Sequence, residues 1–521
     1  MLSVHQRFAF AGASVATLAL LAAGLPSVAT AAADPDLSRF YRQEIKWAAC
    51  EGEGMPKDLR CGKVTVPLDY ANPGGGTLDI ALARYRATGS SRGSVLMNFG
   101  GPGGPGISTL AAAGSHNMGL TKGYDVVTFD PRGVGRSSPV SCGQGADEAS
   151  DTTDPTVDVG DPQAVLEALR KEAAKCAKHS GPVLPHIGTI NTSRDMDVIR
   201  HALGDKKLNY LGFSYGARLG AVYAAQFPKK TGRMVLDGVD TLTEPLSERA
   251  LVGAEGQQVA LENFLNWCTE DMACPFGQDP RRARQQVVQL VDSVEQYPVP
   301  TDTGQKFTGL DLVAAISQAL YTEELWPTLE RALASLVQDG DARGLMQLTG
   351  MGALTDLRRT EAVGDGGIVD PADIPIDNLP AALMAINCAD DPDRPTAAQV
   401  LKEIDELSAA YEKASPIFGP YRLAQVLMCY GRPKGTDYIR DQVRDLSAPK
   451  MLLVGTRGDP ATPYRWTVET AERLGSSAVV LDNKGEGHTG YGSSKCVQQK
   501  VDDFLLYGSL PDSGSSCGPE D

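Results

Sequence analysis

The sequence predicts an α/β protein, with a mostly parallel central sheet flanked by helices and interrupted by a large, mainly helical insertion. Short apolar segments alternate with helical patterns from about Lys63 to Leu236, an order typical of parallel strands joined by helices. After Val239 amphipathic helical stretches take over, and strand-like segments return only at Lys450. One α/β domain with an inserted helical cap is the simplest architecture that explains this order.

The chain divides into four predicted segments. Arg7 precedes an apolar stretch from Phe8 to Leu21, and the small residues from Ala29 to Ala33 supply a cleavage site, a pattern typical of export signals. Because that stretch is too short to span a bilayer, we expect a secreted protein without a membrane anchor. The predicted segments are the signal peptide (1–33), the first part of the core (34–240), the cap (241–440) and the second part of the core (441–521).

The apolar periodicity assigns the individual elements. The predicted strands are Val64 to Val66, Leu78 to Tyr85, Ser94 to Phe99, Tyr124 to Phe129, Leu208 to Leu211, Arg233 to Leu236, Lys450 to Gly455 and Ala478 to Leu481. The first two are expected to be antiparallel, because only a glycine-rich turn separates them. The predicted helices are Ser193 to Leu203, Ala217 to Phe227, Leu310 to Tyr321, Leu325 to Gln338, Ala397 to Ala414, Tyr464 to Leu474 and Lys495 to Tyr507.

Charge and cysteine content narrow the function classes. The net charge of −16 argues against a nucleic-acid partner, because binding phosphates requires a basic face. Ten cysteines suit an oxidising compartment, and no CxxC or histidine cluster indicates a metal site. Pairing sequence neighbours predicts the bridges Cys50 with Cys61, Cys142 with Cys176, Cys268 with Cys274, Cys388 with Cys429, and Cys496 with Cys517.

A G-x-S-x-G motif at Gly212 to Gly216 has the setting of a nucleophile elbow. An apolar strand-like segment leads into it and an alanine-rich helical segment follows, which exposes Ser214 on a tight turn at the sheet edge. The motif also occurs at Gly89 to Gly93 and at Gly514 to Gly518, where no helical pattern follows. Ser214 is therefore the predicted nucleophile.

Chain order selects the base and the acid. On such a fold both follow the nucleophile, and His488 is the only one of the six histidines after Ser214. The acid that orients the imidazole is expected after the preceding strand, where Asp459 lies. Asp237 and Asp482 also follow strands, and each has the alternative of a turn residue or a helix cap.

The glycine-rich segment from Gly100 to Gly106 follows the third predicted strand. Its glycines allow backbone amides to face a ligand without a Cβ in the way, so we expect it to supply half of an oxyanion hole. The amide of Tyr215, directly after the nucleophile, is expected to supply the other half.

The same motifs resemble a known family. NFGGPGGPG (98–106), FDPRGVGRSS (129–138), GFSYG (212–216), GTRGDPATP (455–463) and GEGHTGYG (485–492) are similar to the secreted tripeptidyl aminopeptidases of actinobacteria, relatives of the proline iminopeptidases. The resemblance covers nearly all of the mature chain. It implies an α/β-hydrolase fold with a cap, serine-dependent peptide hydrolysis at a free N-terminus and no cofactor, and it assigns Gly101 with Tyr215 to the oxyanion hole and Ser214, Asp459 and His488 to the triad.

The substrate is less well specified. A carboxylate is expected to hold the ammonium group of a free N-terminus, and Asp390 and Asp391 beside Cys388 are candidates; the alternative is that both are solvated loop acids. Arg432 stands where this family is expected to carry Trp, which puts the leaving-side preference in doubt if that loop borders the cleft. A proline iminopeptidase-like enzyme and a secreted carboxylesterase or lipase remain the alternative functions.

Overall fold

The computed structural model describes residues 35–518, except for 53, 115–118, 144–161, 243, 302, 303, 305, 350–367, 437, 438, 440–442 and 445. The predicted signal peptide and the predicted end of the cap at residue 440 therefore lie outside the described residues. Among the helices that are described, none combines the length and the apolar composition needed to cross a membrane.

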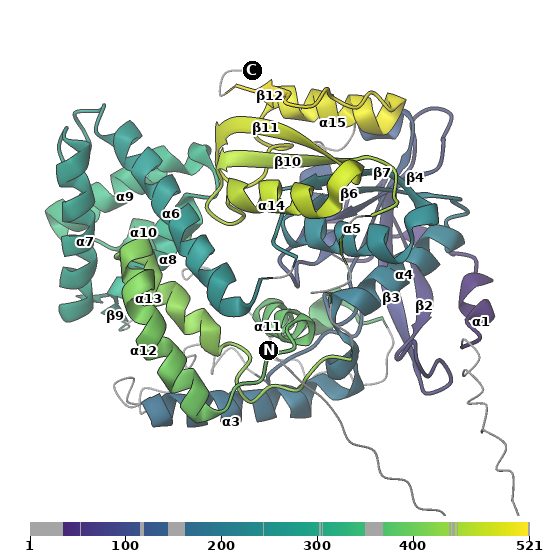
Figure 1. The fold of residues 1–521 in the computed structure, drawn as a ribbon, viewed down its shortest axis with the longest axis horizontal. Helices are drawn as coiled ribbons and strands as arrows, with labels where there is room; N and C mark the ends of the chain where they lie inside the picture. The colour runs from purple at the N-terminus through teal and green to yellow at the C-terminus, as the bar shows by residue number, and fades with distance from the viewer. Residues whose placement is uncertain are drawn as a thin grey trace, which may run out of the picture. The chain divides into compact units, whose positions relative to one another are not determined.

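A central sheet organises the protein (Figure 1), and within the described residues its strand order is β1-β2-β3-β5-β4-β6-β7-β10-β11-β12. Every neighbouring pair from β5 to β12 is parallel, whereas β1, β2, β3 and β5 pair antiparallel. The predicted sheet and its early antiparallel pair are confirmed. The strands are β1 (Ala48–Ala49), β2 (Arg60–Pro67), β3 (Thr77–Tyr85), β4 (Ser94–Asn98), β5 (Asp125–Phe129), β6 (Leu208–Phe213), β7 (Thr231–Asp237), β10 (Met451–Gly458), β11 (Ala478–Glu486) and β12 (Ser516–Cys517).

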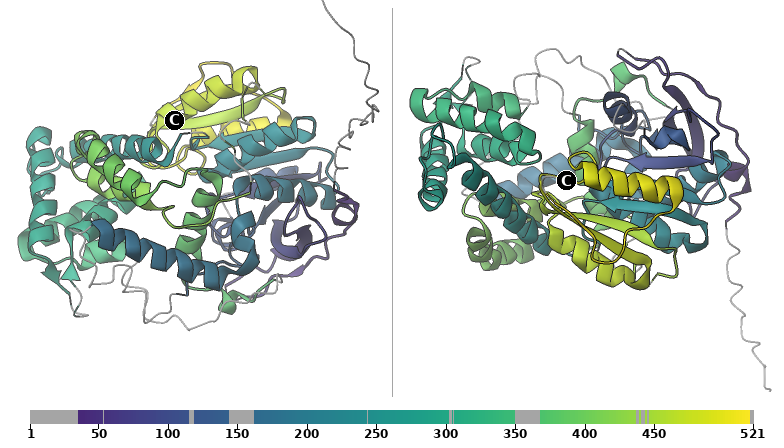
Figure 2. Two further views of the ribbon diagram at one scale, coloured as in Figure 1. Left: turned by 60° about the horizontal axis from the view of Figure 1, so that its bottom comes forward. Right: turned by 90° about the horizontal axis from the view of Figure 1, so that it is seen from above.

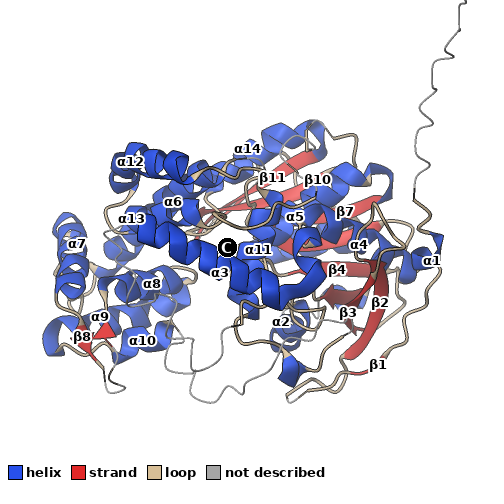
Figure 3. Ribbon diagram, turned by 90° about the horizontal axis from the view of Figure 1, so that it is seen from below, coloured by secondary structure: helices blue, strands red, loops and turns tan. Residues whose placement is uncertain are grey.

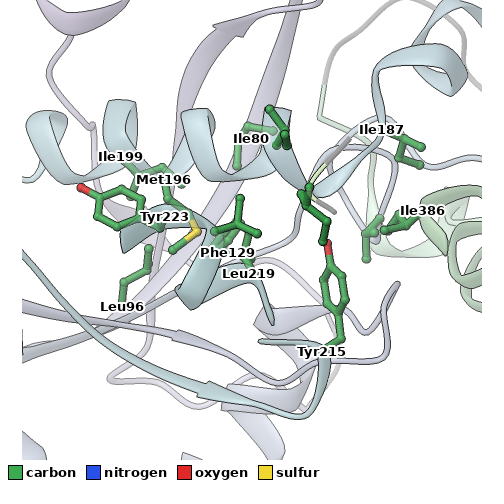
Figure 4. Packing of buried hydrophobic residues seen from close by; sticks show 14 of the residues in the cluster. Ile80, Leu96, Phe129, Ile187, Met196, Ile199, Tyr215, Leu219, Tyr223 and Ile386 are labelled. Carbon is green, nitrogen blue, oxygen red and sulfur yellow. The ribbon is translucent and has the colours of Figure 1, made fainter. Parts of the chain in front are cut away.

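Alternating residues of the buried strands pack into two separate cores. Leu96 of β4 packs with residues of α4 (Thr189–Ala202) and α5 (Tyr215–Gln226), among them Met196 and Tyr223 (Figure 4). Its neighbours Val95 and Met97 face the opposite core, with α2 (Gly106–Ala113) and α15 (Lys495–Tyr507). Near the C-terminus, α14 (Tyr464–Leu474) and α15 cover opposite faces of the sheet, as the yellow segments of Figures 1 and 2 show. Because strands buried on both faces need apolar residues throughout, they appear in the sequence as continuous apolar segments.

The described elements between Leu246 and Leu423 are helices apart from the short strands β8 (Val299–Pro300) and β9 (Lys306–Phe307), as Figure 3 shows in blue and red. Many of them share a third core around Phe264 and Trp326. By contrast, Ile386 of α11 packs into the core of the sheet with α4 and α5. The helices of this segment are α6 (Leu246–Cys268), α7 (Pro280–Gln296), α8 (Gly309–Ala319), α9 (Trp326–Asp339), α10 (Arg343–Leu348), α11 (Asn378–Asp390), α12 (Ala397–Ala414) and α13 (Phe418–Leu423).

All five predicted disulfides are present, with S–S distances of 1.97 to 2.10 Å. The bridge between Cys142 and Cys176 joins the loop after β5 to α3 (Pro162–Ser180), a helix that the sequence analysis did not predict. The short helix α1 (Ser38–Tyr41) packs on the sheet core through Phe40. The loops that the five disulfides close stabilise the protein mainly by restricting the unfolded chain.

Candidate active site

Ser214 occupies a strained turn between β6 and α5. Its backbone has φ 56° and ψ −123°, a conformation that costs free energy for a residue with a side chain. The surrounding chain leaves room only for glycine. A Cβ on Gly212 would collide with the carbonyl oxygen of Gly216, and one on Gly216 would lie 2.5 Å from the carbonyl oxygen of Asn98 in β4. The two glycines of the motif thus let strand, turn and helix pack closely, and the turn holds the serine at the carboxyl end of the sheet.

The other two copies of the motif lack this setting. Gly89 to Gly93 lies in the loop between β3 and β4, and Gly514 to Gly518 surrounds the short strand β12. Neither copy is followed by a helix in the described residues, as the sequence predicts.

His488 and Asp459 form a close pair. The Nδ1 atom of His488 lies 2.9 Å from both carboxylate oxygens of Asp459. Asp459 follows β10, and His488 lies directly after β11. The Asp459 side chain is fully buried and that of His488 is 13% exposed. An imidazole held through Nδ1 presents Nε2 as its free nitrogen, which is the geometry that a general base needs.

Further donors fix the Asp459 carboxylate. It accepts hydrogen bonds from the amides of Ala461 and Thr462 at 2.8 Å, from the Thr462 hydroxyl at 2.8 Å and from the Thr489 amide at 3.1 Å. Burial alone would raise the pKa of Asp459, but the His488 charge and these hydrogen bonds hold that pKa below its usual value. Burial opposes protonation of His488, and the Asp459 charge outweighs it, so the pKa of His488 is raised.

The two other acids considered from the sequence have different surroundings. Asp237 is buried at the end of β7 and accepts the amides of Gly490 and Tyr491 at 2.8 to 3.1 Å, so it anchors the loop that carries His488. Burial raises the pKa of Asp237 to about 6. Asp482 forms two 2.8 Å hydrogen bonds with the Arg457 guanidinium.

A segment of the helical insertion contacts His488 directly. The carbonyl oxygen of Tyr321, just after α8, accepts the His488 amide at 2.8 Å, and the two rings meet edge to face at 5.2 Å. Gly487 has φ 84°, and a Cβ there would lie 2.8 Å from the same carbonyl oxygen. The insertion therefore helps to position the loop after β11.

The glycine-rich segment after β4 lies against the nucleophile turn. A Cβ on Gly100 would lie 3.0 Å from Cβ of Ser214 and 3.3 Å from the amide nitrogen of Tyr215. Within the described residues, the amides of Gly101 and Tyr215 donate to no protein atom. Asp130 fixes the end of this segment, because its Oδ1 accepts the amide of Ile107 in α2 at 3.0 Å. The segment that carries Gly101 thus lies against Ser214 and the amide of Tyr215.

A cavity of 480 Å³ opens beside Ser214. Gly101 and Thr462 line it with the serine, and the rest of its wall comes largely from α6, α8, α11 and α13 of the helical insertion. Its size lies within the range of small-molecule sites. Residues that are distant in the sequence therefore enclose one chamber with the predicted nucleophile in its wall.

Comparisons with known proteins agree with this geometry. A family model described as TAP-like protein matches residues 415–517, and one described as alpha/beta hydrolase fold matches residues 95–339. Serine protease Hip1 of Mycobacterium tuberculosis is 34% identical over 507 residues, which cover 91% of each chain. The chain belongs to the TAP-like family of α/β-hydrolases. It is thus a serine hydrolase.

Two further relatives show the range of this TAP-like family. Tripeptidyl aminopeptidase of Streptomyces lividans is 31% identical over 92% of this chain and 88% of its own length. Carboxylesterase B of Mycobacterium tuberculosis is 30% identical over 89% of this chain and 87% of its own length. The names of these relatives thus include both peptidase and esterase activities.

Asp390 and Asp391 do not line the Ser214 cavity of this TAP-like protein. They border a smaller cavity of 30 Å³ that shares Arg249 and Asn387 with it. Asp390 is buried, accepts the amide and hydroxyl of Thr189 at 2.7 and 2.5 Å, and lies 3.5 Å from Arg218. These contacts tie Asp390 to α4 and α5 of the core.

Arg432 is also absent from the wall of the Ser214 cavity. Its guanidinium is buried and donates to the carbonyl oxygen of Met428 at 3.1 Å and to the sulfur atoms of Cys176 and Met384 at 3.3 and 3.4 Å. Arg432 was expected to affect the leaving-side preference only if its loop borders the cleft. The Arg432 side chain does not border the cleft.

Several polar residues of the site were not predicted from the sequence. Thr462 holds Asp459 and lines the cavity, and Asp240 lines it while forming a 2.7 Å ion pair with Arg218. Thr462 lies within GTRGDPATP (455–463), the motif that contains Asp459, so this motif could have indicated Thr462 as a site residue. Asp240, Arg249 and Arg422 belong to no such motif, and only packing brings them together.

Two groups of side chains have spacings that would suit a metal ion. They are Cys142, Glu172 and Cys176, and Cys268, Cys274 and Glu330. In both groups the cysteines are joined by a disulfide, so their sulfur atoms are not the thiolates that bind metals. Among the described residues, these groups give no reason to expect a cofactor.

Proposed function

We propose that this chain is a secreted serine exopeptidase that releases tripeptides, or other short peptides, from free N-termini. The observation that carries the proposal is the arrangement around Ser214, with two free amides beside it, the His488 and Asp459 pair nearby, and a chamber walled by the helical insertion. The relatives named as serine protease and tripeptidyl aminopeptidase support peptide bonds as the target.

In the proposed reaction, His488 accepts the proton of Ser214 as its Oγ attacks the scissile carbonyl. Asp459 stabilises the imidazolium, and the amides of Gly101 and Tyr215 donate to the developing oxyanion. His488 then gives the proton to the leaving amine, which departs and leaves an acyl-enzyme. Water, activated by the same imidazole, hydrolyses that ester and restores the free serine.

The cavity wall supports an exopeptidase over an endopeptidase. Residues of α6, α8 and α13 line the space beside Ser214, and we expect them to limit how much of a chain can lie on the acyl side. A closed end is the general way in which an enzyme selects a chain terminus. The volume of 480 Å³ suits a short peptide better than an extended chain.

The ammonium group of such a substrate needs a carboxylate partner. Asp390 and Asp391 are the residues predicted from the sequence, and Asp240 is a third carboxylate, which lines the same cavity as Ser214. Replacing each of the three carboxylates with Asn in turn shows which of them binds the ammonium group. The residue that holds the ammonium is the one whose replacement raises KM for unblocked tripeptides more than for their N-acetylated counterparts.

The decisive experiment compares anilides of Pro, Ala-Pro, Ala-Pro-Ala and N-acetyl-Ala-Pro-Ala with a short-chain ester. The proposal requires the highest kcat/KM for the unblocked tripeptide. Fastest cleavage of the Pro anilide would identify a proline iminopeptidase-like enzyme, and indifference to the acetyl group would indicate an endopeptidase. The relative named carboxylesterase B makes the ester a necessary comparison, and a preference for it would indicate an esterase.

Export is the second part of the proposal. Five disulfides are typical of proteins that fold in an oxidising compartment. We expect the full chain, expressed in a bacterium with a secretion pathway, to reach the medium with its N-terminus near residue 32 or 34. Intact protein retained in the cells, with residues 1–33 still attached, would contradict export.

A further inference from the structure

Two arginine side chains line the Ser214 cavity without an ionic partner. The ionised side chains in its wall are Asp240, Arg249 and Arg422. Asp240 forms a 2.7 Å ion pair with Arg218, whereas within the described part of the chain neither Arg249 nor Arg422 forms an ion pair. The charge that the wall presents to the cavity is therefore positive.

Neutral amides hold both guanidinium groups in place. Arg249 donates to Oδ1 of Asn387 at 3.0 Å. Arg422 donates through Nε to Oε1 of Gln257 at 2.8 Å and through Nη1 to Oε1 of Gln425 at 3.2 Å. Amide oxygens orient a guanidinium without neutralising its charge, and each arginine keeps N–H groups that these bonds do not use.

Asp240, Asp390 and Asp391 lie close enough to act on the Arg249 charge, but among the residues that the structure describes none forms an ion pair with it. Burial lowers the pKa of Arg249 to about 10 and also lowers that of Arg422, so the surroundings disfavour both positive charges.

Both arginines are attached to or packed on one face of α6. Arg249 belongs to α6, and the Arg422 guanidinium rests on the helix at Gly253, where an added Cβ would lie 3.3 Å from its Cζ. Residues four apart lie on one face of a helix, about 6 Å apart along its axis. Gln257, the next residue on this face, is the partner of Arg422. Both arginines line the Ser214 cavity, so one carboxylate bound there can accept hydrogen bonds from guanidinium N–H groups.

From this arrangement we infer that Arg249 and Arg422 form a subsite for a substrate carboxylate, so that the enzyme prefers peptides carrying an acidic group in the cavity. The inference rests on the proposed peptidase function and adds a substrate preference to it. An arginine left unpaired in a largely buried wall is costly unless a ligand supplies the anion, and a peptide can supply one without any cofactor. The carboxylate can come from a Glu or Asp side chain or from the C-terminus of a short peptide.

The test uses pairs of substrates that differ only in that charge. Ala-Pro-Ala anilides with Glu or Gln at each of the three positions report a side-chain carboxylate, and tetrapeptides ending in a free acid or an amide report a C-terminal one. At one of these places we expect kcat/KM to favour the charged member by about tenfold or more. The place of the preference identifies the source of the carboxylate, and ratios near 1 throughout overturn the inference.

Substitutions then locate the preference. In Arg249→Gln and Arg422→Gln the charged-to-neutral ratio should fall towards 1, whereas Arg422→Lys, which keeps the charge, should retain part of it. Arg331→Gln, an exposed arginine of α9, is the matched control and should keep the parent ratio. Because each ratio is measured within one variant, a partial loss of folded protein does not change it. Unchanged ratios in both glutamine variants contradict the subsite.

Failure of the peptidase proposal is distinguishable from failure of this subsite. If no unblocked tripeptide is cleaved, the peptidase proposal fails, and the subsite is then tested by calorimetric binding of the same peptides to Ser214→Ala. Tighter binding of the charged member, weakened by salt, supports the subsite, and equal binding of both members overturns it.

Discussion

Arg218 and Arg249 are both largely buried near the nucleophile, yet their surroundings differ. Arg218 of α5 is compensated by the protein itself, with Asp240 at 2.7 Å, Asp390 at 3.5 Å and the carbonyl oxygen of Thr241 at 3.2 Å. Arg249 of α6 donates to a single side chain, the neutral Asn387. The two regions thus pair their buried arginines with different kinds of partner. In the core beneath Ser214, the charged side chains pair with one another. In the helical insertion, the Arg249 guanidinium has no ionic partner among the described residues and is available to a ligand.

The same contrast holds for the catalytic machinery. The Asp459 carboxylate has five donors from its own chain, which leaves it no role except to hold His488 and the adjacent loop. Ser214 and Gly101, in contrast, line the cavity. If the core is self-compensated and the cavity wall is open to ligands, substitutions in the two regions should have different effects, the largest at Ser214.

Replacement of Ser214 with Ala should remove turnover and leave the fold intact. We expect kcat to fall by roughly 10⁴-fold to 10⁶-fold, because a serine triad acts as a unit. The measurement is steady-state hydrolysis of the Ala-Pro-Ala anilide, with circular dichroism as the control for folding. Activity within tenfold of the parent would contradict the mechanism.

Replacement of Asp459 with Asn should lower kcat by about 10⁴-fold, because an amide at Nδ1 favours the wrong tautomer of His488. The matched control is Asp482→Asn. Asp482 lies within β11, because this strand continues beyond the predicted end at Leu481, and its carboxylate binds the Arg457 guanidinium. The control should retain kcat within about twofold, since exposed ion pairs contribute little. Equal losses in the two variants would show that Asp459 has no special role.

The pH dependence of kcat/KM should reflect the shifted pKa of His488. Neutral imidazole is the base, and the net effect of Asp459 is to raise that pKa above 6.5. Activity should therefore rise about tenfold per pH unit on the acidic limb and level off above the raised pKa. The substrate should be a short ester, because it has no group that titrates in this pH range. With it, the acidic limb of kcat/KM should move to lower pH in Asp459→Asn. A limb that stays in place would assign it to another group.

Asp240→Asn and Asp390→Asn should separate the cavity wall from the core. We expect Asp390→Asn to lower the free energy of unfolding by about 1 to 3 kcal/mol, because it leaves buried donors of Thr189 and Arg218 poorly satisfied. Urea unfolding measures this loss. Asp240→Asn also removes a partner of Arg218 and should lower stability as well, but in addition it should reduce the ratio of unblocked to N-acetylated tripeptide cleavage by about tenfold, as expected for a lost charged hydrogen bond. The opposite pattern would favour the ammonium role predicted for Asp390.

Much of the fold and the catalytic pattern could be predicted from the sequence because local signals agree with the final structure. The predicted bounds of α12, α14 and α15 match those observed, since each helix has a strong apolar period. Short motifs with a fixed chain order likewise singled out Ser214, Asp459 and His488, and the structure brings the latter two into contact.

The rest depends on packing that no local pattern reveals. The sequence indicated neither that Arg422 rests on Gly253 of α6 nor that Tyr321 holds the His488 amide, because each contact joins segments far apart in the chain. Asp390 shows the same limit. Its position beside a predicted disulfide suggested a ligand site, yet Thr189 and Arg218, which engage it, could be identified only once α11 was placed on the core.

The most direct test of the central claim is the mass of the products from one peptide of about ten residues and from its N-acetylated twin. If the chain is a tripeptidyl exopeptidase, mass spectrometry should show the N-terminal tripeptide released first from the free peptide and almost no cleavage of the acetylated one. Release of single residues, or internal fragments from both peptides, would contradict the account.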